Sequence, residues 1–181
     1  GEIGALTSAS LLTIHPGRRT AKRSPSEMDY KRLTHYLEAV HTCMTDTGVK
    51  VAIENMEPKI NALICSPEQM AETLEYHPWL SFTLDTAHAA LGNADDLEDY
   101  INWFFDRIAN VHVSAVGAGG PHMRIDGNEE ISRALTLLDD YGYGGPLTFE
   151  LEDLRFARPL SGAEKVAILK EEVGYLEKFF D

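Results

Sequence analysis

Residues Phe82–His88, with the sequence FTLDTAH, contain in one unit the pattern that decides the fold. Side chains on a β-strand point alternately to two faces, so Thr83 and Asp85 share one face while Leu84 lies on the other. The strand ends at the ionisable residue, and a loop and a helical stretch follow it. One such ending indicates little by itself, because the start of a solvated loop has the same composition.

The same unit occurs five times along the chain. The predicted strands are Leu11–His15, Val51–Glu54, Phe82–Asp85, Ile108–His112 and Leu147–Glu150. The predicted helices are Ser26–Thr47, Pro67–Tyr76, Asp95–Asp106, Asn128–Tyr141 and Gly162–Phe180. Strands that alternate with helices predict βαβ units and a parallel sheet, and therefore an α/β fold.

Each predicted strand ends in an ionisable side chain. These residues are His15, Glu54, Asp85, His112 and Glu150. In every strand the residue directly before the ionisable residue is bulky and apolar. The residue two positions before the ionisable residue is small or polar. The apolar set can pack beneath the helices, while the ionisable set shares the opposite face. Five such endings in succession favour a functional site over a solvated rim, since the carboxyl ends of the strands form the active site of a (β/α)₈ barrel.

Two imidazoles and three carboxylates at one mouth indicate a metal site. Carboxylates at close range disfavour each other's ionised forms, and a divalent cation removes that conflict. Mixed nitrogen and oxygen ligands without a thiolate suit Mn²⁺, Zn²⁺, Co²⁺, Fe²⁺ or Mg²⁺ better than Ca²⁺. The pattern therefore predicts one divalent cation of undetermined identity rather than a bare acid–base cluster.

Three further residues in the loops are candidates for substrate binding or a second metal, together with His15. His88 follows Asp85 by three residues, and His122 and Arg124 lie in the Gly- and Pro-rich segment 119–127. Such loops often shape substrate sites at this face of a barrel. A loop histidine and a solvated arginine are the alternatives. The remaining histidines have no ligand neighbours in sequence and are expected to be structural or surface residues: His35, His41 and His77.

Composition excludes several classes of protein. The 181 residues include 29 Asp+Glu and 16 Lys+Arg, a net charge of −13 that argues against binding nucleic acid through the overall field. The sequence lacks an apolar run of roughly 18 residues, so no membrane span is expected. Cys43 and Cys65 are too few for a disulfide framework. We expect a single cytoplasmic domain over residues 1–181.

The ordered segments resemble the xylose isomerase-like TIM-barrel superfamily, which contains sugar and sugar-phosphate isomerases and epimerases and the AP endonuclease family 2. The segments that carry the resemblance are His15–Gly17, Ile53–Met56, Leu84–Ala89, Val111–Ser114 and Phe149–Glu152. Each is a weak motif, but the ordered set is specific. The resemblance implies a (β/α)₈ barrel of which this chain holds about strands 4–8 with their helices, its C-terminal part. Gly1–Ala5 would end the helix before strand four.

The resemblance also implies roles. Matching positions in the isomerase and epimerase branch hold one divalent metal: Glu54, Asp85, His112 and Glu150. The two glutamates there also exchange protons with the substrate, and the position of His88 contacts it. In the endonuclease branch, three matching histidines join a three-zinc cluster: His15, His88 and His122. This chain departs from the family pattern at two positions. Many members have an aspartate at the position of Ala115, and the endonuclease has one at the position of Gly120.

The leading hypothesis is a metal-dependent sugar or sugar-phosphate isomerase or epimerase that transfers a proton beside a metal-bound carbonyl through Glu54 and Glu150. A lyase or dehydratase of the same superfamily begins with the same step. The alternatives are an endonuclease IV-like AP endonuclease and a non-catalytic truncated barrel. The expected partner is a small sugar or sugar phosphate. Because five parallel strands leave two edges, a homo-oligomer that covers the open barrel is a further expectation.

Overall fold

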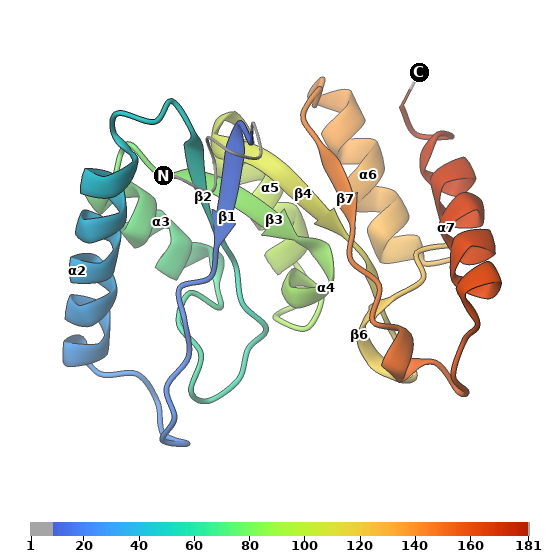
Figure 1. Ribbon diagram of the computed structural model, residues 1–181, viewed down its shortest axis with the longest axis horizontal. Coiled ribbons are helices and arrows are strands. Elements are labelled where there is room, and N and C mark those ends of the chain that lie inside the picture. Colours follow the sequence, from blue (N-terminus) through green and yellow to red (C-terminus); the bar gives the residue numbers. More distant parts are fainter. Residues whose placement is uncertain (1–8, 181) are drawn as a thin grey trace.

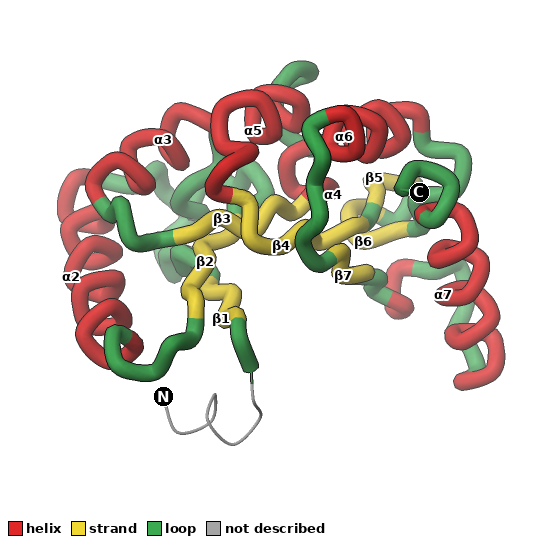
Figure 2. Tube along the Cα trace, turned by 90° about the horizontal axis from the view of Figure 1, so that it is seen from above, coloured by secondary structure: helices red, strands yellow, loops and turns green. Residues whose placement is uncertain are grey.

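The computed structural model describes residues 9–180, in which five parallel strands form one curved sheet. In sheet order they are β1 (Leu11–Ile14), β2 (Lys50–Glu54), β3 (Ser81–Asp85), β4 (Ile108–Val113) and β7 (Leu147–Phe149). Seen from above, the strands follow an arc, as in part of a barrel wall (Figure 2). The predicted α/β, TIM-barrel-like fold is confirmed. The expectation for Gly1–Ala5 lies outside the described residues.

Helices cover the outer side of this arc (Figure 2). They are α2 (Glu27–Met44), α3 (Pro67–Tyr76), α4 (Thr86–Ala89), α5 (Asp96–Phe104), α6 (Glu129–Asp140) and α7 (Gly162–Leu176). Short 3₁₀ turns follow at Phe105–Arg107 and Asp153–Arg155. Helices α2 and α7 stand at the two ends of the arc (Figure 1). Among the described residues, none of these helices has the length and apolarity needed to cross a membrane.

Local sequence signals set the helix boundaries. Ser66 and Asn128 accept hydrogen bonds from backbone N–H groups in the first turns of α3 and α6, as N-cap residues do. Helix α2 ends at Met44, three residues before the predicted end. A turn follows in which the Thr47 N–H donates to the Met44 carbonyl, and Gly48 then adopts a φ of +69° that favours glycine.

The two faces of the sheet differ as the alternation predicts. Ile53, Leu84 and Val111 point outward and are fully buried beneath the helices. The inner face carries small and polar side chains, and the Thr13 and Thr83 hydroxyls lie 2.9 Å apart on it. Burying the apolar set supplies the main driving force for folding, so the inner face is left available for polar groups.

A two-stranded antiparallel hairpin, formed by β5 (Ala115–Gly117) and β6 (Gly120–Met123), occupies a segment that the sequence indicated only as a loop. Gly120 has a φ of +110°, a conformation that side-chain-bearing residues rarely adopt. The hairpin carries His122 on its second strand. It therefore gives this residue a more defined position than a free loop would.

The edge strands are those predicted, β1 and β7. Both end one residue before the predicted ionisable residue, since His15 and Glu150 lie just beyond them. An edge strand pairs on one side only, so its last residue has fewer backbone hydrogen-bond partners. The Glu150 N–H still donates to the Val113 carbonyl at 3.3 Å, so the backbone of Glu150 remains tied to the end of β4.

Leu84→Ala tests the outward packing of the strands. Leu84 is fully buried, so its truncation should lower the free energy of unfolding by about 2–5 kcal/mol. The matched control is Leu154→Ala, because the Leu154 side chain is 86% exposed and its loss should change stability by less than about 0.5 kcal/mol. Urea titration followed by circular dichroism measures both, and equal losses would contradict the assigned packing.

Candidate functional site

Four of the predicted ligands converge at the carboxyl ends of the strands. One ligand atom from each lies within 4.8 Å of the others: Glu54, Asp85, His112 and Glu150. Asp85 and His112 are direct partners in the β3–β4 ladder. Glu54 pairs with Thr83, two residues before Asp85, and its longer side chain spans that difference. Strand register therefore determines which side chains meet.

The imidazole of His112 is the common neighbour of three carboxylates. Its Nδ1 atom lies 2.9 Å from Glu150 Oε2, 3.4 Å from Glu54 Oε2 and 4.0 Å from Asp85 Oδ2. Glu54 and Asp85 are almost completely buried, whereas the Glu150 side chain is 44% exposed. The cluster consequently has a closed floor and one side open to solvent.

Several buried polar atoms of this cluster make no well-aligned hydrogen bond among the described residues, although they lie at ion-pair distance from one another. They are both carboxylate oxygens of Glu54, Asp85 Oδ2 and His112 Nδ1. Leaving a buried polar atom unsatisfied costs about 1–3 kcal/mol, and more for a charged group. Oxygen and nitrogen donors that are buried, mutually close and without well-aligned hydrogen bonds suit a divalent cation. The residues present therefore fit a metal ion.

Burial and the close charges also shift the pKa values of the cluster residues. Burial, together with the charges of Glu54 and Glu150, raises the pKa of Asp85 to about 7. Burial also disfavours the charged form of His112, but its contacts with Glu150 and Glu54 outweigh this and raise its pKa to about 10. Burial disfavours the Glu54 carboxylate as well, yet the neighbouring histidines lower its pKa to about 2.

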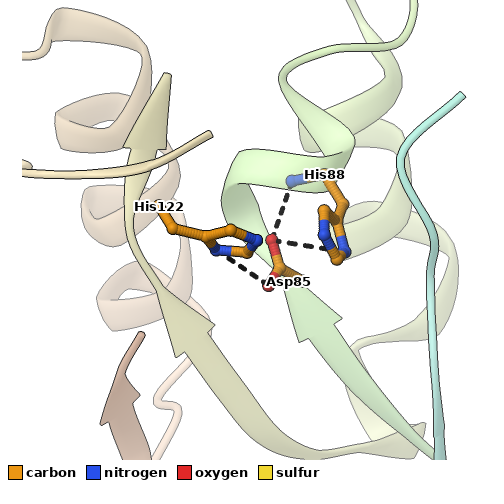
Figure 3. A group of neighbouring side chains, drawn as sticks. All are labelled: Asp85, His88 and His122. Carbon is orange, nitrogen blue, oxygen red and sulfur yellow. Dashed lines mark hydrogen bonds and ion pairs between the residues drawn. The ribbon is translucent and has the colours of Figure 1, made fainter. Parts of the chain in front are cut away.

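A second group shares Asp85 and consists of Asp85, His88 and His122. Figure 3 shows the two imidazoles on either side of the carboxylate. His88 Nδ1 lies 3.7 Å from Asp85 Oδ1, and His122 Nδ1 lies 4.0 Å from Asp85 Oδ2. The two rings meet edge to face with centroids 4.9 Å apart. His122 has a φ of +62°, an uncommon conformation for a residue with a side chain and one that often marks a functional position.

Hydrogen bonds that the sequence did not predict hold the strand ends in place. The fully buried Asn55 side chain donates to the Asp85 carbonyl at 3.0 Å and accepts from the Asp85 N–H at 2.8 Å. The Thr86 hydroxyl donates to the Ser114 carbonyl at 2.6 Å and accepts from the Ser114 N–H at 3.1 Å. The sequence feature that could have indicated this role is the position of Asn55 directly after Glu54. From there a side-chain amide can form hydrogen bonds with the backbone of the neighbouring strand.

His15 contacts the first group through Glu54, and Arg124 does not contact it. His15 Nε2 lies 3.2 Å from Glu54 Oε2, although the His15 side chain is 61% exposed. Arg124 turns toward α7, where its Nε atom lies 2.8 Å from Glu172 Oε1 and its Nη2 atom 2.9 Å from Glu171 Oε2. The three remaining histidines stand away from the cluster, His35 and His41 exposed on α2 and His77 buried after α3.

Solved structures of sugar epimerases share this fold. D-allulose 3-epimerase from Methylomonas sp., solved with D-allulose, has a TM-score of 0.77 at 15% identity over 99% of this chain and 66% of its own. A D-tagatose 3-epimerase-like protein has a TM-score of 0.69 at 21% identity, covering 98% and 67%. The IOLI protein, solved with a zinc atom, has a TM-score of 0.75 at 16% identity, covering 99% and 67%.

Sequence comparison identifies a relative and a family model. An uncharacterized protein of Methanocaldococcus jannaschii is 31% identical over 179 residues, which make up 97% of this chain and 65% of the relative. The chain thus spans slightly less than two thirds of that relative's length. The family model described as xylose isomerase-like TIM barrel matches residues 3–179, nearly the whole sequence. The chain therefore belongs to the xylose isomerase-like TIM-barrel family.

Proposed function

We propose that this protein is a metal-dependent isomerase or epimerase of a small sugar or sugar phosphate. In this proposal four residues hold one divalent cation: Glu54, Asp85, His112 and Glu150. Two of them, Glu54 and Glu150, also transfer protons. His15, His88 and His122 surround this centre and contact the substrate.

The observation that carries the proposal is that the carboxylates of Glu54 and Glu150 both lie close to the imidazole of His112. The distances from His112 Nδ1 are 2.9 Å to Glu150 and 3.4 Å to Glu54, so the two carboxylates border the same small space. Proton transfer to and from carbon needs a base and an acid within reach of one substrate atom or of two neighbouring atoms. The fold shared with sugar epimerases supports this assignment.

The chemistry follows from these positions. When bound, a divalent cation supplies positive charge that makes the C–H bond beside a substrate carbonyl more acidic. Glu150, at the open side, and Glu54, at the floor, act as the proton-transfer pair. One carboxylate removes the carbon-bound proton, and the other, as a carboxylic acid, returns a proton to the opposite face of that carbon or to the neighbouring carbon. The first outcome is epimerisation. The second, with a hydroxyl proton moved between the two oxygens, is isomerisation.

A second candidate function is phosphodiester cleavage at abasic sites in DNA. The group of Asp85, His88 and His122 favours it, since these side chains could hold a further cation beside the first. The net charge of −13 weighs against it, because a nuclease of this type contacts phosphates along the DNA backbone. Incubation with a duplex that contains one abasic site distinguishes the two. Nicking without any sugar turnover would reverse the order of the candidates.

Asp85→Asn tests the metal centre. The substitution keeps the shape of the side chain and removes its charge, so metal affinity should fall about tenfold or more. Because a cation that binds only the folded state raises stability, the melting temperature should rise with added Mn²⁺ or Zn²⁺ in the wild type and only at higher concentrations in the variant. Asp140→Asn, on the exposed face of α6, is the matched control. Identical metal responses in all three proteins would argue against this site.

Glu150→Gln tests proton transfer. Glutamine retains the size and a coordinating oxygen but cannot act as a base, so the rate should fall about 10²–10⁴-fold even at saturating metal. The assay is incorporation of solvent deuterium into a panel of ketoses and aldoses that begins with D-allulose. Glu177→Gln, an exposed glutamate at the end of α7, should exchange at the wild-type rate.

Product analysis in the same assay separates the related reactions. An epimer or an aldose–ketose pair supports the proposal, and loss of water from the sugar indicates a dehydratase that begins with the same proton abstraction. If Glu150→Gln incorporated deuterium at the wild-type rate at saturating metal, Glu150 would be a ligand only. That result would refute the two-glutamate mechanism.

A further inference from the structure

A cavity of about 490 Å³ lies beside the metal-ligand cluster, between the segment after β1 and the first turns of α2. Figure 1 shows this segment, in blue, passing beyond the carboxyl ends of the strands before it enters α2. His15 forms part of the cavity wall and also approaches Glu54 to 3.2 Å. His15 therefore borders both the cavity and the candidate active site, and the volume of the cavity suits a small ligand.

The wall of this cavity is positively charged in an acidic protein. Residues 18–32 contain six of the 16 Lys+Arg residues of the chain. The charged residues that line the cavity are Arg18, Arg19, Arg32 and Asp29. Among these four residues, three arginines against one aspartate leave an excess of two positive charges.

The single carboxylate in the wall is fully engaged. Asp29 is 5% exposed, and it lies 2.8 Å from Arg19 Nε and 3.2 Å from Arg23 Nη1. Its Oδ2 atom also accepts hydrogen bonds from the hydroxyl and the N–H of Ser26, and these bonds hold the pKa of Asp29 well below its usual range. Asp29 and Arg19 therefore form a fixed pair and leave the charge of the cavity to the other arginines.

Arg18 and Arg32 both line the cavity, and no carboxylate among residues 9–180 lies within 4 Å of either guanidinium group; the charge of Arg18 acts on Glu57 only at longer range. Arginine presents planar N–H donors whose spacing matches the oxygens of a phosphate group, and such pairs are the stronger hydrogen bonds in proteins. Both residues are exposed at the cavity, so their guanidinium donors are available to a dianionic group. A neutral sugar would gain no charge pairing from them.

We propose that this cavity binds the phosphate monoester of a phosphorylated sugar, with Arg18 and Arg32 as the residues that recognise it. The sugar portion would extend past His15 to the cluster of Glu54 and its neighbours. The assignment of the anion to a sugar substrate rests on the proposed function, whereas the binding of phosphate by the two arginines does not.

Calorimetric titration of the full chain with inorganic phosphate tests the cavity directly. Arg18→Gln and Arg32→Gln should each weaken binding about tenfold or more, because each removes a charged hydrogen-bond donor. Lys22→Gln is the matched control, since Lys22 belongs to the same segment but does not line the cavity, and it should change the affinity less than about twofold. Equal losses in all three variants would indicate a diffuse field and overturn the proposal, as would wild-type affinity in both arginine variants.

Two further measurements separate this proposal from the proposed function. Asp85→Asn, which alters the metal cluster, should retain phosphate affinity, and loss of affinity would place the phosphate on the cation instead. In deuterium exchange, phosphorylated ketoses should react at lower concentration than their unphosphorylated forms, and Arg18→Gln should reduce this difference. Arginine-dependent phosphate binding without any sugar turnover would retain the cavity and refute the isomerase. Sugar turnover with unchanged phosphate affinity in both arginine variants would support the isomerase and refute the phosphate-binding cavity.

Discussion

The crowding of three carboxylates, two of them buried, around one imidazole is the constraint on which this structure depends. Parallel strands bring their carboxyl ends to one edge, and here Glu54, Asp85 and Glu150 meet there around His112. Burial raises the cost of each charge, as the pKa of about 7 at Asp85 reflects. Such an arrangement persists only if the rest of the fold stabilises it. The apolar outer face of the sheet and its helices supply that stability, while the inner face remains polar.

Rigid attachment of the strand ends is the second requirement, because a cluster that can move apart would relieve its own repulsion. Asn55 binds both backbone groups of Asp85, and Thr86 joins the end of β3 to Ser114 after β4. The strained backbone of His122 is held at a further point, where the Glu152 N–H donates to its carbonyl at 2.9 Å. These bonds engage backbone groups and do not use the side-chain atoms of the candidate metal ligands.

The sequence predicted those features that depend on local patterns. Strand alternation placed Leu84 outward and Asp85 inward, and the resemblance then selected which strand ends form one group. Features that depend on contacts distant in sequence were not predictable in this way. Arg124 is the clearest case, because its partner Glu172 lies 48 residues further along and is completely buried on α7. A solvated arginine and one paired with a buried glutamate look identical in sequence.

The distribution of charge narrows the class of substrate further than the net charge does. At physiological ionic strength, charges more than about 8 Å apart in solvent are largely screened, so an overall charge of −13 says little about one cavity. Within residues 18–32, Asp29 pairs with Arg19 and Arg23 and Glu27 pairs with Lys31, so among the described residues Arg18, Lys22 and Arg32 are the basic side chains of this segment without an ion pair. A polynucleotide requires basic groups along an extended surface, whereas a compact cationic wall beside His15 matches a ligand with a single anionic end.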